Sequence, residues 1–441
     1  MRRGFEEPWP SATLPRRRCA QRERSHLKGS KTVAMTVQAN AIPTAASRPF
    51  LEVWLVSIGH AMTHWYPATF YLLLPLIGKE LGLSFGEIGA VMTCQYLVGA
   101  ISNVPGGLFV DMVGRKPVLM AVSLLWVGVP YLLMGFSHSY ALLLLCTALV
   151  GFGNNLWHPV AIPLLADRFP DRRGLAVAFH GMGGNVGDAV APVVAGAMLS
   201  TLTWRSVIEI NVIPALLVAL LLLLYFGKAS GAQKKADNAA PMRLIDMLRA
   251  IAALFKNRGV LTISVSSAFR TMTQTTLLTF LPVFLAGQMG YSPLWVGGYM
   301  FALQAAGFIA APIAGHLSDR MGRRQIIMSS MLMTAVVFIA MAAVGQSPAF
   351  VLFISVLGFF LFSIRAVMQA WLLDATPHNL GGSSIGILFG MQALGGAIGP
   401  GLGGAIADQF GLIATFYFLG GTIILANLLL FFTPFDGRKA V

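Results

Sequence analysis

Long apolar segments and short polar loops alternate along most of the chain. Each apolar segment is close to the length of about 20 residues that a membrane-spanning helix needs. A long polar stretch, residues 227–258, separates the first six segments from the last six. The pattern predicts an all-α integral membrane protein with twelve transmembrane helices in two bundles of six. The predicted helices cover residues 51–77, 86–110, 117–136, 140–166, 174–200, 206–226, 259–286, 293–316, 324–345, 348–373, 381–406 and 411–433.

The polar segments outside these helices define the expected domain organisation. Residues 1–48 are basic and contain no apolar run of the kind that a secretory signal requires, so we expect a disordered cytosolic tail, with Met35 as an alternative translation start. Residues 242–256 carry apolar and basic side chains at helical spacing, which predicts an amphipathic surface helix. The expected organisation is a tail (1–48), an N-terminal bundle (49–226), a cytosolic linker (227–258), a C-terminal bundle (259–434) and a second cytosolic tail (435–441).

Composition and charge agree with a membrane protein. Hydrophobic residues make up 56% of the chain and charged residues 11%, whereas soluble domains carry about 25% charged residues. Of the 31 Lys and Arg residues, only Lys79 and Arg205 fall in outer loops, and Arg270 and Arg365 lie inside helices, if both termini are cytoplasmic; the other 27 lie in tails or inner loops. This bias predicts a multi-pass protein of the cell inner (plasma) membrane with both termini in the cytoplasm. The basic charge then contacts lipid, and no nucleic-acid partner is expected.

One ten-residue motif occurs at the same place in each half of the chain. Both copies read G-x-x-x-D-x-x-G followed by two basic residues, and they start 208 positions apart. The glycines allow close helix packing and a tight turn, and the basic pair favours the cytoplasmic face. The motif residues are Gly107, Asp111, Gly114, Arg115 and Lys116 in the first copy and Gly315, Asp319, Gly322 and Arg323 in the second.

The repeated motif resembles the loop signature of the major facilitator superfamily. The resemblance implies two pseudo-symmetric six-helix bundles, each a pair of inverted three-helix repeats, with a substrate site between them at the membrane midplane. It also implies a gating role, in which Asp111, Arg115, Asp319 and Arg323 form ion pairs that hold the cytoplasmic side closed and break when the bundles rock.

Small residues and prolines recur in the helices predicted over residues 174–200 and 381–406. The second of these contains the full pattern G-x8-G-x3-G-P-x-x-G-G, which resembles a signature that drug–proton antiporters of the superfamily carry in their fifth helix. Two interpretations stay open, an antiporter signature and close helix packing without directional meaning. The residues assigned to helix packing are Pro192, Gly395, Gly399, Pro400 and Gly403.

A narrower resemblance involves the N-terminal half. Gly59-His60, Trp157-His158-Pro159, Arg172-Arg173-Gly174 and the run from His180 to Gly187 resemble motifs of the fosmidomycin-resistance branch of the superfamily. The resemblance implies export of a small anionic antibiotic or metabolite in exchange for protons. This chain has His64 where an acidic residue is usual in the first helix of that branch, so a coupling role for that carboxylate would have to move or be lost.

Two arginines inside predicted helices are candidates for binding an anion. At about 1.5 Å per residue, Arg270 and Arg365 lie roughly 16 and 14 Å from the inner ends of their helices. A guanidinium at that depth is costly unless it is used or paired, and it suits a carboxylate or phosphonate. The alternative is that each arginine neutralises an acidic side chain such as Asp188 or Glu209, or caps backbone carbonyls. The residues assigned to substrate binding are Arg270, Arg365, Gln274, Gln369, Trp157 and Tyr66. Aromatic side chains such as Trp157 and Tyr66 can line a pocket, with a position in lipid or at the membrane interface as the alternative. For the glutamines, hydrogen bonds across helix contacts are the alternative.

Titratable residues in the N-terminal half are candidates for proton coupling. At about 1.5 Å per residue, His60 and His158 lie roughly 14 Å from the inner ends of their predicted helices, near the depth of the arginines, and His64 and Asp188 lie roughly 20 and 21 Å from those ends. Histidine exchanges protons near neutral pH, so these four residues are assigned to proton coupling. Hydrogen bonds that fix helix packing are the alternative role for each histidine. Gln304 and Gln392 are further polar candidates.

No motif for catalysis is found. The sequence lacks a phosphate-binding loop, H-E-x-x-H, metal-binding cysteine pairs and G-x-S-x-G. We therefore expect no enzyme activity, no cofactor and no metal. The predicted function is proton-coupled antiport (efflux) of a small organic anion or drug by alternating access, by a protein that is expected to be monomeric in lipid. Proton-coupled uptake of an organic acid and a non-transporting membrane sensor are the alternatives.

Overall fold

The computed structural model describes residues 50–113, 116–154, 156–227, 256–376 and 381–433, apart from the side chains of residues 103–105, 107, 108, 110–113, 227, 381 and 382. The expected tails, residues 242–255 of the predicted amphipathic helix, and Gly114 and Arg115 of the first motif copy lie outside the described residues.

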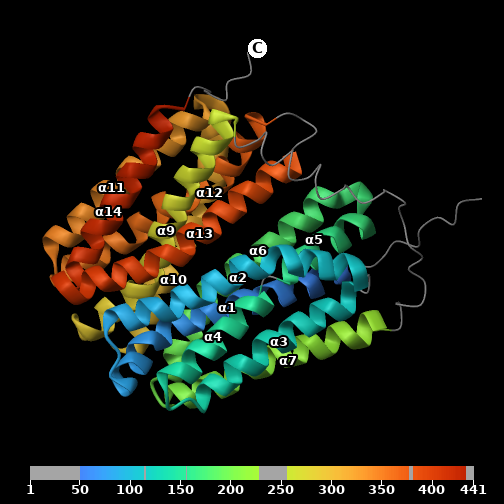
Figure 1. Cartoon of the computed structure of the whole chain (residues 1–441), viewed down its shortest axis with the longest axis horizontal. Helices are drawn as coiled ribbons and strands as arrows, with labels where there is room; N and C mark the ends of the chain where they lie inside the picture. Colours follow the sequence, from blue (N-terminus) through green and yellow to red (C-terminus); the bar gives the residue numbers. More distant parts are fainter. Residues whose placement is uncertain (1–49, 114–115, 155, 228–255, 377–380, 434–441) are drawn as a thin grey trace, which may run out of the picture. The chain divides into compact units, whose positions relative to one another are not determined.

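Every described secondary-structure element is a helix (Figure 1). The first half contains α1 (Leu51–Leu81), α2 (Phe85–Val113), α3 (Lys116–Gly135), α4 (Tyr140–Asn154), α5 (Trp157–Arg168), the 3-10 turn η1 (Pro170–Arg172), α6 (Arg173–Met198) and α7 (Trp204–Gly227). The second half contains α9 (Arg258–Gly287), α10 (Pro293–Met321), α11 (Arg323–Val344), η2 (Pro348–Val351), α12 (Leu352–Asp374), α13 (Gly381–Phe410) and α14 (Leu412–Phe431). The predicted all-α fold class is confirmed.

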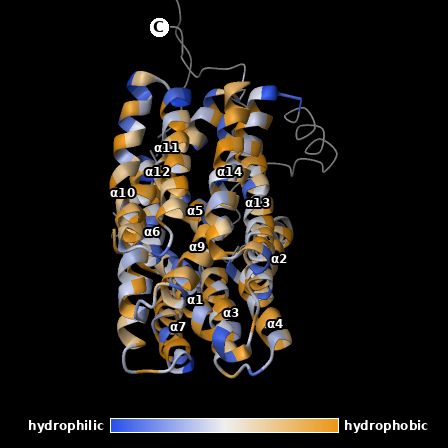
Figure 2. Ribbon diagram, turned by 90° about the vertical axis from the view of Figure 1, so that its left-hand side faces the viewer, coloured by the Kyte–Doolittle hydropathy of each residue, from blue (hydrophilic) through white to orange (hydrophobic). Residues whose placement is uncertain are grey.

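Hydrophobic residues predominate along these helices (Figure 2), and many of the large apolar side chains are exposed. On α7, exposed leucines follow one another at helical spacing, for example Leu217, Leu220, Leu221 and Leu224. Soluble monomers rarely expose a contiguous apolar stripe of this kind, whereas lipid tails solvate it. By length and hydropathy, eight helical stretches within the described residues are long and apolar enough to span a membrane.

The helices α1, α6 and α9 are not among those eight stretches. They are long, but they carry polar side chains in their interiors, and on α9 these polar side chains are buried. Buried polar residues of α9 include Ser264, Ser267, Arg270, Thr273 and Thr276. A spanning helix with this composition avoids lipid and faces other helices or an internal cavity. These three helices supply most of the polar groups discussed below.

The fourth predicted helix, over residues 140–166, coincides with one candidate membrane span, Tyr140–Arg168. Its described residues form α4 and α5, which are separated in the sequence by residues 155 and 156. The Leu156 N–H donates to the Gly153 carbonyl at 3.1 Å, three residues back, as in a tight turn. Pro159 lies in the first turn of α5, where a proline is tolerated because it needs no hydrogen-bond partner for an N–H. His158 lies in the same turn.

The second half repeats the helix packing of the first. α1 packs along α6, α2 along α4, and α3 along α7; correspondingly, α9 packs along α13, α10 along α12, and α11 along α14. The two halves meet through α2 with α13 and α6 with α10, which are again counterparts of each other. This correspondence is the pseudo-symmetry that the repeated motif predicts.

The halves touch backbone to backbone near one end of the helices, which we call the loop end because α1 turns into α2 and α6 into α7 there. A side chain on Gly297 of α10 would collide with the Pro192 carbonyl of α6, and one on Gly89 of α2 would collide with the Pro400 carbonyl of α13. In addition, Asp408 accepts hydrogen bonds from the backbone N–H groups at the start of α2, each at 2.8 Å. The described conformation is therefore closed at the loop end.

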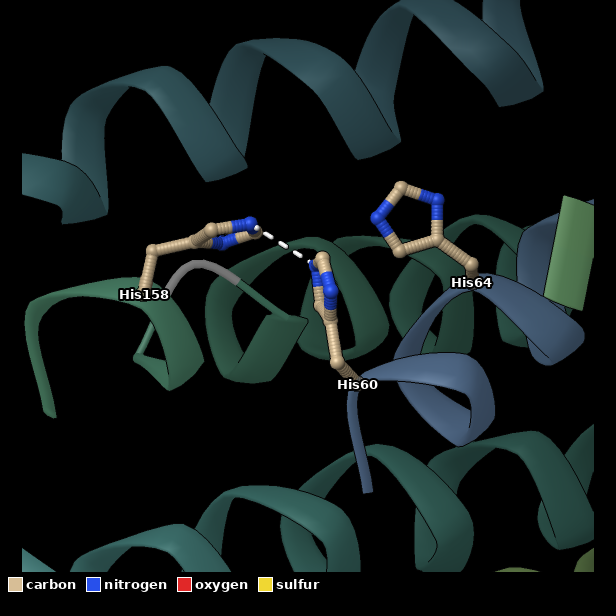
Figure 3. A group of neighbouring side chains, drawn as sticks. All are labelled: His60, His64 and His158. Carbon is tan, nitrogen blue, oxygen red and sulfur yellow. Dashed lines mark hydrogen bonds between the residues drawn. The ribbon is translucent and has the colours of Figure 1, made fainter. Parts of the chain in front are cut away.

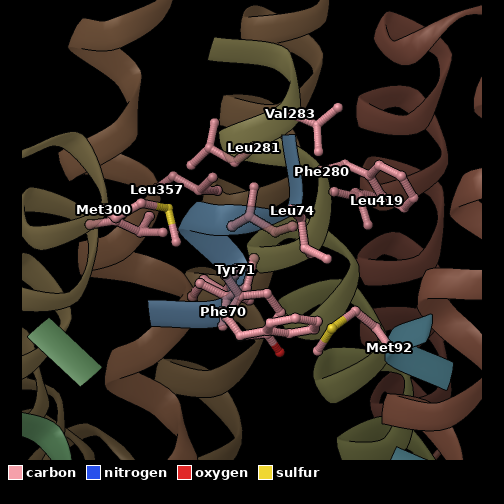
Figure 4. Packing of buried hydrophobic residues seen from close by; sticks show 14 of the residues in the cluster. Phe70, Tyr71, Leu74, Met92, Phe280, Leu281, Val283, Met300, Leu357 and Leu419 are labelled. Atoms are coloured by element: carbon pink, nitrogen blue, oxygen red, sulfur yellow. The ribbon is translucent and has the colours of Figure 1, made fainter. Parts of the chain in front are cut away.

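A shared apolar core accompanies this closure (Figure 4). It joins Phe70 and Tyr71 of α1 with residues of the second half such as Phe280 of α9, Met300 of α10 and Leu357 of α12. A second cluster, which includes Val53, Trp157 and Phe226, contains residues of the first half alone. In a membrane such side chains are stabilised by van der Waals packing against one another, and the shared cluster therefore holds the two halves together.

Candidate functional site

A cavity of about 160 Å³ lies between the two halves. Asn185 and Asp188 of α6 line it from the first half, and residues of α9, α10 and α12 line it from the second. Its polar and charged lining residues are Asn185, Asp188, Arg270, Gln274, Gln304 and Arg365. Phe308 and Phe362 add apolar surface. A small cavity with an apolar wall and a few convergent polar groups is the usual form of a small-molecule site.

Arg270 is the most deeply buried charge of this cavity, with 2% of its surface exposed. Its Nη1 donates to Gln274 Oε1 at 2.9 Å and to the Leu361 carbonyl at 3.3 Å, and its Nη2 donates weakly to Thr271 at 3.4 Å. Its Nε is buried without a hydrogen-bond partner. Among the described residues, no acidic side chain forms an ion pair with Arg270. The guanidinium is therefore held in place by neutral groups and keeps its positive charge uncompensated.

Arg365 of α12 lines the same cavity and has no hydrogen bond or ion pair with another described residue. It is exposed, and its charge acts on Arg270 and on His158. Two like charges at one cavity repel each other, and an anion between them would relieve that repulsion. The cavity therefore combines two positive charges, those of Arg270 and Arg365, with a volume close to that of a small organic anion.

Two alternative roles for the arginines are pairing with an acidic side chain and capping of backbone carbonyls, and only the second is seen among the described residues. Arg270 caps one backbone carbonyl, that of Leu361. Asp188 pairs with His64 at 2.9 Å, and Glu209 is exposed on α7. Neither carboxylate forms an ion pair with Arg270 or Arg365 within the described part of the chain.

Four histidines from three helices gather beside the cavity (Figure 3 shows three of them). His60 Nε2 and His158 Nε2 lie 3.1 Å apart, and the rings of His60 and His180 stack at 3.9 Å. Trp157 Nε1 donates to His180 Nε2 at 3.1 Å. His60 is buried, His64 is half-buried and His158 is exposed. The structure thus brings together all three histidines assigned to proton coupling and adds His180.

Hydrogen bonds fix the tautomers of two of these rings. His60 Nδ1 lies 2.6 Å from the His180 carbonyl, which can only accept, so this nitrogen donates. His64 Nδ1 lies 2.9 Å from Asp188 Oδ2, and the carboxylate likewise accepts. In the neutral rings, the lone pairs of His60 and His64 therefore sit on Nε2.

Three residues assigned to substrate binding do not line the cavity. Trp157 is completely buried and positions His180. Tyr66 is buried against Tyr131, with ring centroids 4.8 Å apart. Gln369 is half-buried and is not a lining residue. The assignment of Trp157, Tyr66 and Gln369 to the substrate therefore has no support in this conformation, while Arg270, Arg365 and Gln274 do line the cavity.

The motif residues assigned to gating pair within their own half wherever they are described. Arg323 bonds Asp319 at 2.6 Å and Asp374 at 3.2 Å, which ties α11 to the ends of α10 and α12. Lys116 bonds Asp167 at 2.7 Å in the first half. Each of these pairs joins a basic residue of the motif to an Asp 51 positions later, although Lys116 is the second basic residue of its copy and Arg323 is the first of its copy. Gly114 and Arg115 and the side chains of Gly107 and Asp111 lie outside the description, so the expected gate of the first half stays a prediction.

The glycines and prolines assigned to helix packing lie at helix contacts. Side chains on Gly395, Gly399 and Gly403 of α13 would meet Ala268, Met272 or Thr276 of α9 at collision distance. Pro192 and Pro400 present their carbonyls to glycines of the opposite half, as described above. Gly315 has open space around it, and Gly322 has a φ of 103°, which only glycine adopts readily.

Sequence reasoning did not assign a role to several residues of the site. His180 and Asn185 belong to a motif that was recognised, but their direction on α6 was unknown. Phe308 and Phe362 are ordinary apolar residues in apolar helices, and the sequence contains no signal that marks them as cavity residues. Gln304 was a polar candidate and lines the cavity, whereas Gln392 donates to Ser267 at 2.6 Å.

Comparison with known protein families agrees with the fold and the repeated motif. The model of the Major Facilitator Superfamily matches residues 53–311 and 298–440. The chain belongs to the Major Facilitator Superfamily. It is thus a multi-pass membrane protein of a transporter family and not an enzyme.

Individual relatives are distant but extend over most of the chain. The fosmidomycin resistance protein of Escherichia coli (strain K12) is 24% identical over 410 residues, 91% of this chain and 97% of that protein. The phosphoglycerate transporter protein of Salmonella typhimurium is 23% identical over 395 residues, 84% of this chain and 85% of that protein. The likeness to the fosmidomycin-resistance branch, seen first in the motifs, is confirmed by the first of these matches.

A solved structure supports the fold. The bacterial homologue of the human lysosomal transporter Spinster, in an inward-facing and occupied conformation, superposes with a TM-score of 0.74 at 16% identity. The match covers 87% of this chain and 96% of that chain. At this identity the likeness concerns the fold alone.

Proposed function

We propose that this protein is a secondary transporter that carries a small organic anion through the cavity between its halves. The single observation that carries the proposal is the Arg270 guanidinium, buried beside a cavity and without an acidic partner among the described residues. An uncompensated buried charge is strongly unfavourable. An anion that binds beside Arg270 and Arg365 supplies the missing compensation.

The size and lining of the cavity favour a compact anion. A volume of about 160 Å³ accommodates a molecule with a phosphonate, phosphate or carboxylate group on a short carbon chain. Gln274 and Gln304 offer amide groups for the remaining polar atoms, and Phe308 contacts the apolar part. The names of the relatives point the same way, since one concerns fosmidomycin resistance and one phosphoglycerate transport.

The transport cycle that we propose is alternating access. In the described conformation the loop end is closed by glycine–carbonyl contacts between the halves. The opposite state would separate these contacts and close the other end. There, the motif residues Asp111, Arg115, Asp319 and Arg323 would hold the two halves together. Arg323 would then exchange some of its present partners within the second half for partners across the gap.

We further propose that the exchange is coupled to protons and exports the anion. Asp188 and His64 form one hydrogen-bonded pair at the cavity wall, next to the arginines that would hold the anion. The other titratable groups near this pair are His60 and His158, and Tyr71 and Tyr96, whose hydroxyls bond at 2.5 Å. Uptake of an organic acid remains the second candidate direction, because the same cavity serves both.

The basic loops support a location in the inner (plasma) membrane with both termini in the cytoplasm. In this orientation the loop end faces outward, and the described conformation is closed on that side. We expect the monomer to be the transporting unit, since the cavity is built within one chain.

Counterflow in proteoliposomes tests the proposal. Purified protein is reconstituted with internal 3-phosphoglycerate or fosmidomycin, and uptake of the labelled compound is followed with and without an imposed pH gradient. Wild type is expected to exchange at least one of these anions, and Arg270→Gln is expected to lose the exchange. Arg320→Gln is the matched control, because Arg320 is exposed at the far end of α10. Unchanged exchange in Arg270→Gln would refute the proposal that the anion binds at Arg270.

A further inference from the structure

We propose that His60, His64 and His158 bind one divalent transition-metal ion, of the kind that imidazole nitrogens prefer, such as Zn²⁺ or Co²⁺. The ligand atoms of the three side chains all lie within 4.8 Å of one another, and the side chains come from two helices, α1 and α5. Figure 3 shows the three rings directed toward a common space. The site is distinct from the arginine cavity, although Asp188 connects them.

The distances suit a tetrahedral ion. Zn–N bonds are about 2.0–2.1 Å, so two ligand nitrogens of a tetrahedral zinc site lie about 3.3 Å apart. His60 Nε2 and His158 Nε2 are 3.1 Å apart already. Since all ligand atoms lie within 4.8 Å, His64 needs a movement of only about 1.5 Å, within the reach of a side-chain rotation. Its half-buried position leaves room for that rotation.

The hydrogen bonds beyond the rings also have the form that metal sites require. Metal-binding histidines usually donate their second ring nitrogen to a carbonyl or carboxylate, which fixes the tautomer and the ring direction. His60 donates Nδ1–H to the His180 carbonyl, and His64 donates Nδ1–H to Asp188. In both rings the lone pair is thereby placed on Nε2, the nitrogen that would bind an ion. The His180 carbonyl and the Asp188 carboxylate thus orient His60 and His64 in the same way.

Without an ion, His158 supplies the hydrogen-bond donor for the lone pair on His60 Nε2. Because His60 Nε2 carries a lone pair, His158 Nε2 must donate the proton of the 3.1 Å contact. When an ion binds His158 Nε2, the proton of that nitrogen passes to solvent and Nδ1 takes up a proton from solvent, so that the ring changes tautomer and stays neutral. The exposure of His158 allows this exchange, and the ring gains or loses no net proton.

Packing holds the cluster in this arrangement. The His180 ring stacks on His60 at 3.9 Å with an angle of 4° between the rings, and Trp157 fixes His180. Gly184 of α6 lies against His60 and His64, and a side chain at this position would meet His60 Cε1 at 2.7 Å. A rigid support of this kind keeps ligands in place for an ion. The exposure of His158 gives the ion a route to the site.

The three side chains provide three ligands, which leaves a fourth coordination position open for water or for an oxygen of another molecule. A group bound there would stand beside the charges of Arg365 and Asp188, since Arg365 acts electrostatically on His158 and Asp188 bonds His64. The inference concerns metal binding alone. It does not depend on the proposed transport of an anion.

Metal binding to the purified full-length protein tests the inference. The protein carries an affinity tag without histidine and is stripped with EDTA. It is then titrated with ZnCl₂ by calorimetry and with CoCl₂ by visible absorption, which shows intense bands for a tetrahedral ion. Wild type is expected to bind one ion per chain and to give the tetrahedral cobalt spectrum. No organic anion is present in this experiment. A failure of metal binding is therefore distinguishable from a failure of anion binding at the arginines.

Variants locate the ion. His60→Gln, His64→Gln and His158→Gln are each expected to weaken Zn²⁺ binding by about 100-fold or more and to abolish the tetrahedral cobalt spectrum, while Asp188→Asn weakens binding by about 10–100-fold. His316→Gln, which changes an exposed histidine outside the cluster, is the matched control and binds like wild type. Size-exclusion profiles and melting temperatures identify any variant that fails to fold. Absence of stoichiometric binding in wild type, or unchanged binding in His158→Gln, would overturn the inference.

Discussion

Gly297 in α10 packs directly against the carbonyl oxygen of Pro192 in α6, so that no side chain fits between the two halves at this point. The counterpart contact joins Gly89 in α2 to Pro400 in α13. Both pairs lie near the loop end, above the cavity that the arginines line. In a transporter that alternates between two states, these contacts have to form in one state and separate in the other.

A bulky residue at Gly297 is therefore expected to trap the protein with its loop end open. Gly297→Leu would force the halves apart by an overpacking cost of about 1–3 kcal/mol, which corresponds to about a 5- to 150-fold change in the balance of the two states. Transport in proteoliposomes should fall accordingly, and spin-label distances across the loop end should lengthen. Gly298→Leu is the control, because nothing lies within 4 Å of a side chain there. Equal effects of both substitutions would show that the contact does not control access.

The packing glycine Gly395 gives a test of stability within the second half. A side chain on Gly395 would collide with the Ala268 carbonyl of α9, whereas one on Gly390 of the same helix meets open space. Gly395→Ala is expected to lower the free energy of unfolding by about 1–3 kcal/mol through overpacking. Gly390→Ala should be neutral or stabilising by up to about 1 kcal/mol, because alanine favours a helix. Thermal unfolding in detergent measures both, and a lower stability of the Gly390 variant would contradict the packing.

Two ion pairs at neighbouring positions should differ in their importance. Arg168 Nη1 bonds Glu52 at 2.8 Å with both side chains at most 10% exposed, while Asp167 bonds Lys116 with its own side chain 58% exposed. Removing one partner of a buried pair costs about 3–5 kcal/mol, because the other charge stays buried. Breaking an exposed pair costs about 0–1 kcal/mol. Thermal unfolding should therefore show a large decrease for Glu52→Gln and a small one for Asp167→Asn. A reversed order would show that the burial of the first pair is incorrect.

Asp188→Asn tests the proposed coupling to protons. The substitution removes the carboxylate that accepts a hydrogen bond from His64, and it leaves Arg270 and Arg365 unchanged. Anion exchange without a pH gradient should persist, and the extra flux that an imposed pH gradient produces should disappear. Asp171→Asn, at an exposed position outside the cavity, is expected to respond to the gradient like wild type. Gradient-driven transport by Asp188→Asn would show that the coupling group lies elsewhere.

The sequence predicted the helices and the arginine pair because both signals are strong and local. A spanning helix is a long apolar run, and a charge such as Arg270 within that run is conspicuous whatever the tertiary structure. The apolar run over residues 140–166 likewise coincides with one candidate span, Tyr140–Arg168, because a proline inside such a run is tolerated in membrane helices.

The rotation of each helix about its axis was beyond sequence reasoning. Trp157 and Tyr66 were assigned to the substrate because aromatic residues often line pockets, yet both face the packed interior of the first half. Polar residues do recur at helical spacing, for example His60 and His64 on α1 and His180 and Asp188 on α6, but this spacing does not say which neighbouring helix they meet. His180 was read as part of a motif, and its contact with His60 depends on how α1 and α6 cross. Only the packed structure brings these rings together.

Equilibrium binding of an anion tests the central claim most directly. Purified wild-type protein and the variants Arg270→Gln, Arg365→Gln and Arg320→Gln are titrated with 3-phosphoglycerate and with fosmidomycin by calorimetry. A hydrogen bond to a charged group contributes about 1.5–3 kcal/mol, so loss of either cavity arginine should weaken binding by about 10- to 150-fold, while Arg320→Gln binds like wild type. Equal affinity of wild type and Arg270→Gln, or a wild type that binds neither anion, would contradict the account.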